Sequence, residues 1–103
     1  TIVCSGVKSI LDVGATLERL ETLNVGVIVY GSHQFPGFYL SDSGITVDWS
    51  LSDPSEIADV MAARRDLSIR SGLVIAHPLP AGNQLDPDLH DQVLTEGLEL
   101  ADS

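Results

Sequence analysis

Two short apolar runs constrain the fold of this chain more than any other feature, because neither alternates with polar residues. The first covers residues 25–30 and contains Val27-Ile28-Val29, and the second covers residues 72–76. Strands that are apolar at every position are typical of a parallel sheet that is covered on both faces. The sequence therefore predicts buried parallel strands at the centre of a layered fold.

Helical patterns separate these runs. Ile10, Val13 and Leu17 recur at helical spacing, and Asp53-Pro54 and Asp86-Pro87 each pair a capping aspartate with a proline at the first helical position. We expect residues 31–44, rich in turn residues and aromatics, to form an ordered loop. The predicted elements are strands over 1–7, 25–30, 45–49 and 72–76, and helices over 9–24, 53–69 and 86–100.

The order of these elements predicts an α/β fold with a mostly parallel sheet flanked by helices. No internal repeat, low-complexity tract or flexible linker divides the chain, so residues 1–103 are expected to form a single α/β segment. The chain starts at Thr1 and has the size of one small domain. We expect it to be a section of a larger catalytic domain or a processed chain.

Charge and composition exclude several functions. Fifteen acidic residues against five basic ones give a net charge of −10, which repels nucleic acid and anionic lipid. The single cysteine, Cys4, cannot form an internal disulfide and is expected to be a buried thiol in a reducing compartment. No apolar run is long enough to span a membrane, and no signal segment opens the chain. We expect a cytoplasmic protein without nucleic-acid or membrane partners.

Lys8 is the only lysine, and it follows the apolar run Ile2-Val3-Cys4 and the small residues Ser5-Gly6. A strand that ends in a tight loop before a helix N-terminus places an ammonium group among free backbone N–H groups. There a lysine can hold an anion or form a Schiff base with a carbonyl carbon. The alternative is a surface lysine without a role.

The other candidate functional residues point less clearly to a function than Lys8 does. The segment before Ser9 lacks the leading glycine of a P-loop, so nucleotide hydrolysis by that route is excluded. His77 follows a buried strand, where open sheets present ligand-binding groups, although a histidine bound to a backbone carbonyl is more common. The acidic residues from Asp86 onward are expected to cap a helix rather than hold a metal. Ser5, Ser9, His33, His77 and His90 could supply a hydrolase triad, but their spacing says nothing about geometry.

Several blocks of the sequence, taken together, match the pattern of a known family. They closely resemble the central part of pseudouridine-5′-phosphate glycosidases, also called the indigoidine synthase A-like family. The resemblance covers nearly the whole chain, and its first two blocks are long and specific. The blocks are CSGVKSILD (4–12), GATLERLETL (14–23), FPGFY (35–39), DSG (42–44), DPSEIA (53–58), GLVIA (72–76) and HPLP (77–80).

The resemblance implies a reversible cleavage of the C–C glycosidic bond of pseudouridine 5′-phosphate to uracil and ribose 5-phosphate. It assigns to Lys8 the Schiff base with C1′ of the ring-opened ribose, an imine that acts as an electron sink. Ser5, Gly6 and His77 are candidate substrate-binding residues. The family is homotrimeric and uses a divalent cation such as manganese, whose ligands lie outside this segment, as do the acid-base glutamate and a second lysine.

The sequence also departs from the family pattern. The family usually has Asn-Pro-Ile-Pro-Glu where this chain has His77-Pro78-Leu79-Pro80-Ala81, and proline where this chain has Gly26. The segment alone is expected to be a poor catalyst. A non-catalytic remnant or assembly module, which packs through its acidic surface and residues 35–39, is the alternative, and a free-standing sugar-phosphate lyase is a third interpretation.

Overall fold

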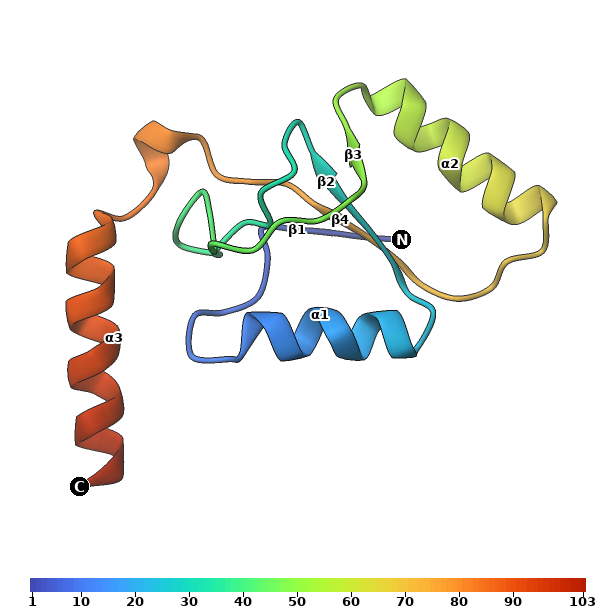
Figure 1. The fold of residues 1–103 in the computed structure, drawn as a ribbon. Coiled ribbons are helices and arrows are strands. Elements are labelled where there is room, and N and C mark those ends of the chain that lie inside the picture. The colour runs from blue at the N-terminus through green and yellow to red at the C-terminus, as the bar shows by residue number, and fades with distance from the viewer.

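A computed structural model describes all residues 1–103, and its centre is a four-stranded sheet in the order β1-β4-β2-β3 (Figure 1). Every neighbouring pair of strands is parallel, which confirms the predicted fold class. Along the chain the elements are β1 (Ile2–Cys4), α1 (Val13–Thr22), β2 (Gly26–Tyr30), β3 (Ser50–Leu51), α2 (Pro54–Asp66), β4 (Leu73–Ala76), the 3₁₀ turn η1 (Ala81–Asn83) and α3 (Pro87–Asp102).

The two apolar runs form the middle of the sheet, as predicted. β4 lies between β1 and β2, with Ile28 opposite Ile75 and Val29 opposite Ala76. Val29 and Ala76 have no exposed surface. Strands with neighbours on both sides and helices over both faces cannot place polar side chains in water, and this explains their unbroken apolar sequence.

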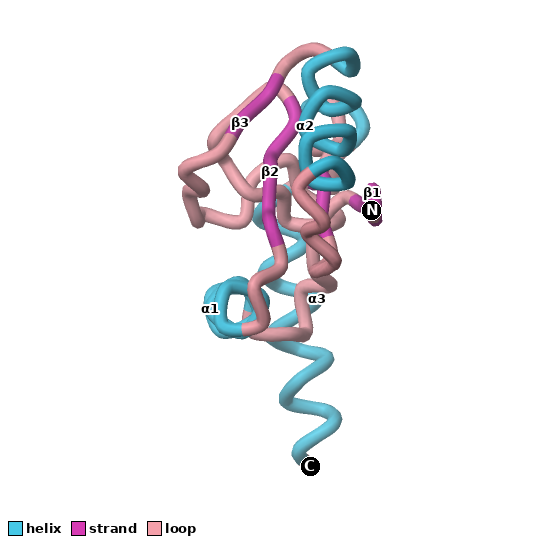
Figure 2. The backbone as a smooth tube through the Cα atoms, turned by 90° about the vertical axis from the view of Figure 1, so that its right-hand side faces the viewer, coloured by secondary structure: helices cyan, strands magenta, loops and turns pink.

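Successive residues of β2 point to opposite faces of the sheet. Ile28 packs in a cluster with Leu73 and Ile75, which the α2 residues Ile57 and Val60 contact. Val29 packs on the other face with Phe35 and Ala76, and this second cluster receives Val13 and Leu17 of α1 together with Val7 and Val47. The sheet thus separates α1 from α2, and Figure 2 shows the two helices on either side of the strands.

Helix α1 begins four residues later than the sequence predicted. The Asp12 carboxylate accepts a hydrogen bond from the Ala15 N–H at 2.9 Å, and this cap fixes Val13 as the first helical residue. Ile10, expected on the apolar stripe of the helix, lies before it and is 66% exposed. The helix ends at Thr22, two residues before the predicted end at Asn24, and Asn24 takes a left-handed conformation with φ 59° just beyond it.

The strand predicted over residues 45–49 is wrong. Thr46 forms an isolated antiparallel bridge with Gln34, flanked by hydrogen bonds from Phe35 N–H to Ile45 O and from Val47 N–H to His33 O. The alternating pattern therefore reflects a short pairing inside the 31–49 loop. The fourth strand of the sheet is β3, which follows that segment.

Several apolar side chains expected in the core are exposed. Met61 and Leu67 have the helical spacing that predicts an apolar stripe on the 53–69 helix, but they are 44% and 72% exposed. No residue of α3 is buried. Cys4, expected to be buried, is only half-buried. These positions have no covering element within the 103 residues. None of the helices is both long and apolar enough to cross a membrane.

Candidate functional site

Lys8 lies on the loop that leaves the carboxyl end of β1. All four strands are parallel, so their carboxyl ends meet at one edge of the sheet, where open α/β folds bind ligands. Ser5-Gly6 follows β1 at this edge and His77 follows β4. The side chain of Lys8 is exposed and is therefore accessible to a ligand.

Gly6 anchors this loop on the amino-terminal side of Lys8. It forms an antiparallel bridge with Gly37, and the Ser5 carbonyl accepts a hydrogen bond from the Phe38 N–H at 3.1 Å. The φ of Gly6 is +110°, and a Cβ there would lie 2.3 Å from the Pro36 carbonyl oxygen. Only glycine allows two backbone segments to approach this closely.

The structure does not place Lys8 among free N–H groups at the start of α1, where it was expected. Lys8 precedes the first helical residue by five positions, and the Asp12 carboxylate already occupies the N–H of Ala15. The Lys8 carbonyl instead accepts the Leu11 N–H at 2.9 Å and closes a turn. A carboxylate at the cap repels a second anion, so a phosphate near Lys8 needs a different partner from the helix N-terminus.

His77 shares the sheet edge with Lys8, but its ring points to the other face. Its backbone N–H donates to the Cys4 carbonyl at 2.7 Å, while the ring stacks on Tyr30 with centroids 5.1 Å apart. Tyr30 packs on the α2 face, whereas Val7, next to Lys8, packs on the α1 face. The ring Nδ1 lies 3.1 Å from the Pro78 carbonyl oxygen. This contact with a backbone carbonyl is the common arrangement that the sequence analysis named as the alternative to a ligand-binding role.

Among the serines and histidines considered for a triad, the structure joins Ser9 and His90. Ser9 Oγ and His90 Nε2 form a hydrogen bond of 2.5 Å between residues 81 positions apart. His90 Nδ1 and Asp91 Oδ1 are 3.6 Å apart, too far for a hydrogen bond. The third member of a triad is therefore missing. Sequence spacing gave no sign of this long-range pair.

Comparison with known proteins assigns the chain to a family. The family described as "Indigoidine synthase A like protein" matches residues 1–103, the full length of the chain. The chain belongs to this family. A Salinispora tropica protein named pseudouridine-5′-phosphate glycosidase is 58% identical over 100 residues, 96% of this chain and 31% of that protein. A Streptomyces griseus protein of the same name is 56% identical over 96% of this chain and 31% of its own length.

Solved structures agree with this membership. An indigoidine synthase A-like protein from Thermotoga maritima superposes with a TM-score of 0.80 at 30% identity, over 90% of this chain and 32% of that one. The prealnumycin C-glycosynthase AlnA, solved with ribulose 5-phosphate, gives a TM-score of 0.84 at 24% identity, over 95% of this chain and 32% of that one. The second likeness shows the fold alone. The chain spans about a third of the length of these relatives.

Among the acidic residues from Asp86 onward, Asp86 caps a helix. The Asp86 carboxylate accepts hydrogen bonds from the N–H groups of Asp88 and Leu89 at the start of α3, as the sequence predicted. No group of three or more His, Cys, Asp or Glu side chains is placed to hold a metal ion. The residues present therefore do not fit the divalent cation that the family resemblance implies.

The loop over residues 31–49 covers one edge of the core. Phe35 is 1% exposed and packs against Val29, so this aromatic side chain caps the core. Tyr39 is 48% exposed and makes an edge-to-face contact with Phe38, whose φ is +67°.

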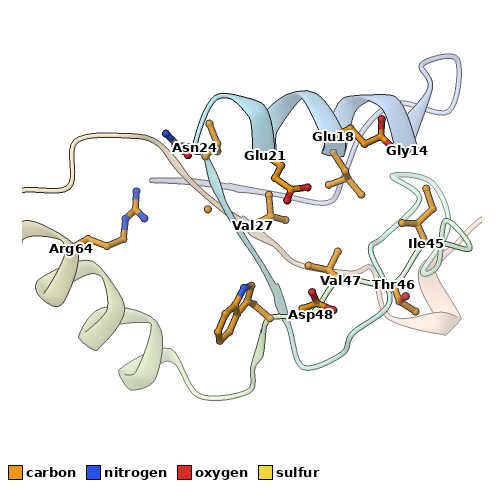
Figure 3. A pocket seen from close by; sticks show the side chains of 14 residues that line it. Gly14, Glu18, Glu21, Asn24, Val27, Ile45, Thr46, Val47, Asp48 and Arg64 are labelled. Carbon is orange, nitrogen blue, oxygen red and sulfur yellow. The ribbon is translucent and has the colours of Figure 1, made fainter.

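A cavity beside α1 is separate from Lys8. Its volume is about 580 Å³, and it runs along α1 between Gly14 and Asn24 toward the first residues of β2 (Figure 3). Glu18 and Glu21 line it, and Arg64 lies at one end. Lys8 is not among the lining residues, so this cavity adds nothing to the lysine site.

Proposed function

We propose that this chain is the lysine-bearing segment of a pseudouridine-5′-phosphate glycosidase. In this proposal the complete protein cleaves the C–C bond between uracil and ribose 5-phosphate, reversibly. The observation that carries the proposal is the position of Lys8. The only lysine of a chain that is 58% identical to a relative of that name lies exposed at the carboxyl edge of a parallel sheet.

Lys8 is the proposed nucleophile. Its neutral amine bonds to C1′ as the C1′–O4′ bond of the ribose opens; O4′ takes the electron pair and a proton, and the amine nitrogen loses a proton. In this ring-opened adduct the nitrogen lone pair forms the C=N bond as the bond from C1′ to uracil breaks. Uracil takes the electron pair of that bond and a proton, and water hydrolyses the imine to ribose 5-phosphate. The proton donor lies outside this segment in this proposal. Lys8 therefore supplies only the nucleophile that forms the imine.

Ser5 and Gly6 are proposed to contact the sugar phosphate. The bridge between Gly6 and Gly37 fixes the backbone of Ser5 and Gly6 at the carboxyl end of β1, where open α/β sheets bind ligands. His77 is exposed at the same edge, where a ring fixed by stacking on Tyr30 can form part of the rim of the site.

The remaining groups are proposed to come from other parts of the polypeptide. A divalent cation, manganese in this proposal, takes its ligands there, because the residues of this chain form no metal site. The complete protein is proposed to be a cytoplasmic homotrimer. The absence of any possible internal disulfide supports a reducing compartment.

A chimera tests the proposal. Residues 1–103 replace the matching third of the Salinispora tropica relative, which supplies the rest of the enzyme, and uracil release from pseudouridine 5′-phosphate is measured. We expect the chimera to release uracil, and Lys8→Ala and Lys8→Arg to abolish release. A folded chimera without activity would refute the proposal and favour the assembly-module alternative, which the exposed apolar residues of α3 support.

Borohydride trapping separates the two roles of a lysine. A Schiff base with ribose 5-phosphate is reduced to a stable secondary amine, and peptide masses locate it. Lys8→Arg keeps the positive charge but cannot form an imine. Adduct at Lys8 in the chimera and none in Lys8→Arg would support the nucleophile. If Lys8→Arg still released uracil, Lys8 would be only an anion clamp.

A further inference from the structure

Helix α3 contacts the rest of the protein through a polar side chain, that of His90. Figure 1 shows the helix projecting away from the sheet, and its apolar side chains Leu89, Val93 and Leu100 are 50%, 58% and 74% exposed. The side chain of His90, in contrast, is only 10% exposed. A polar residue is thus covered more fully than Leu89, Val93 and Leu100 of the same helix, which is the reverse of ordinary packing.

The loop that carries Lys8, residues 5–12, contacts this histidine. The hydrogen bond between His90 Nε2 and Ser9 Oγ is the only hydrogen bond that joins α3 to any residue before Asp86. Ser9 immediately follows Lys8 in the chain. The lysine therefore lies between two fixed points, the bridge of Gly6 on one side and the bond of Ser9 on the other.

Val7, just before Lys8, packs against the cluster of Val29, Phe35 and Ala76, but little else holds the part of the loop that follows Lys8. Its only internal hydrogen bond runs from the Leu11 N–H to the Lys8 carbonyl, and Ile10 and Leu11 are 66% and 54% exposed. With few buried contacts, such a segment opens easily unless a distant contact restrains it. The Ser9 bond is that contact.

We propose that His90 is a positioning residue for Lys8. By holding Ser9, it restrains the loop so that the lysine amine faces the sheet edge where the sugar binds. This inference rests on the proposed function for its chemical consequence, but the restraint itself does not. His90 Nδ1 is buried without a hydrogen-bond partner, so Ser9 is the only group that orients the ring through a hydrogen bond.

Hydrogen exchange tests the restraint in the 103-residue chain. The amide of Leu11 reports opening of the loop, because its acceptor is Lys8 O. A net hydrogen bond corresponds to about a two- to tenfold change in opening, so Ser9→Ala and His90→Leu are each expected to speed exchange by that factor. The double variant should be no faster than either single variant. His90→Gln, whose amide can still pair with Ser9, should restore slow exchange.

Gln92→Leu is the matched control. Gln92 lies on the same helix and bonds only to Glu96, one turn away, so its replacement should leave Leu11 exchange unchanged. Effects of Ser9→Ala and His90→Leu that simply add, or no effect of either, would overturn the inference. An equal effect of Gln92→Leu would also overturn it, because the loop would then respond to the helix as a whole.

Trapping of Lys8 in the chimera gives the functional readout. His90→Leu is expected to slow adduct formation with ribose 5-phosphate about two- to tenfold at saturating sugar, with His90→Gln restoring the rate. A rate unchanged in His90→Leu would overturn the positioning role. If wild-type Lys8 gave no adduct while the exchange coupling held, the proposed function would fail and the restraint would stand.

Discussion

Replacement of Gly6 by alanine tests the close approach that anchors the lysine loop. The new Cβ would lie 2.3 Å from the Pro36 carbonyl oxygen and 3.1 Å from its carbon. The oxygen is a backbone atom in a residue with no exposed side chain, so it cannot turn away as a flexible side chain would. To reach even 3.0 Å, the two segments must separate by about 0.7 Å.

Two costs follow from this separation. The positive φ of Gly6 costs an alanine about 1–2 kcal/mol. Loss of the neighbouring hydrogen bond from Phe38 N–H to Ser5 O costs about 1 kcal/mol more. We expect Gly6→Ala to lower the free energy of unfolding by about 2–3 kcal/mol, a large part of the stability of a small domain.

Gly44→Ala is the control, because Gly44 has a φ of +85° but nothing within 4 Å of its added Cβ. Its cost should be about 1 kcal/mol, since only backbone strain acts and alanine also restricts the unfolded chain. Urea unfolding followed by far-ultraviolet circular dichroism measures both variants. Equal unfolding free energies for Gly6→Ala and Gly44→Ala would refute the reasoning.

Three further predictions concern stability. Val29→Ala should cost about 2–3 kcal/mol in urea unfolding, because the side chain is fully buried, whereas Val3→Ala, at a 68% exposed edge position, should stay within about 0.5 kcal/mol. Arg64→Lys should lower the free energy of unfolding by about 1–2 kcal/mol, since one guanidinium nitrogen donates to the Ser71 and Gly72 carbonyls at 2.6 and 3.0 Å and an ammonium group cannot keep that geometry. An unchanged urea midpoint would contradict this. The hydrogen bond from the Ser55 N–H lowers the pKa of the Asp53 carboxyl below its ordinary value. The stabilisation from the ionised Asp53 is therefore present above the unfolded-state pKa near 4 and disappears as pH falls through the folded-state pKa. The free energy of unfolding, measured from pH 6 to 2, should depend less on pH in Asp53→Asn.

The elements with strong local signals could be predicted from sequence. The unbroken apolar runs of β2 and β4 predicted their burial, and the Asp-Pro pairs at Asp53 and Asp86 predicted the starts of α2 and α3 to the residue. These signals work because capping and burial depend on neighbours that are close in the chain.

Sequence reasoning failed where distant contacts decide the structure. The alternation over residues 45–49 has the period of a strand, but its partner is Gln34 in the same loop rather than the sheet. Leu67 has helical spacing and still faces water at 72% exposure. Period alone cannot say which face another element covers.

The candidate site shows the same division. Lys8 is a candidate because a lone lysine after an apolar run is a local pattern, whereas the contacts on either side of it come from Gly37 and His90, 29 and 82 positions further along the chain. Local sequence thus supplies the proposed reactive group, and distant segments hold the loop that carries it. Changes at Gly37 or His90 should therefore alter the chemistry of Lys8 without touching the lysine, and sequence identity around Lys8 alone is a weak guide to activity.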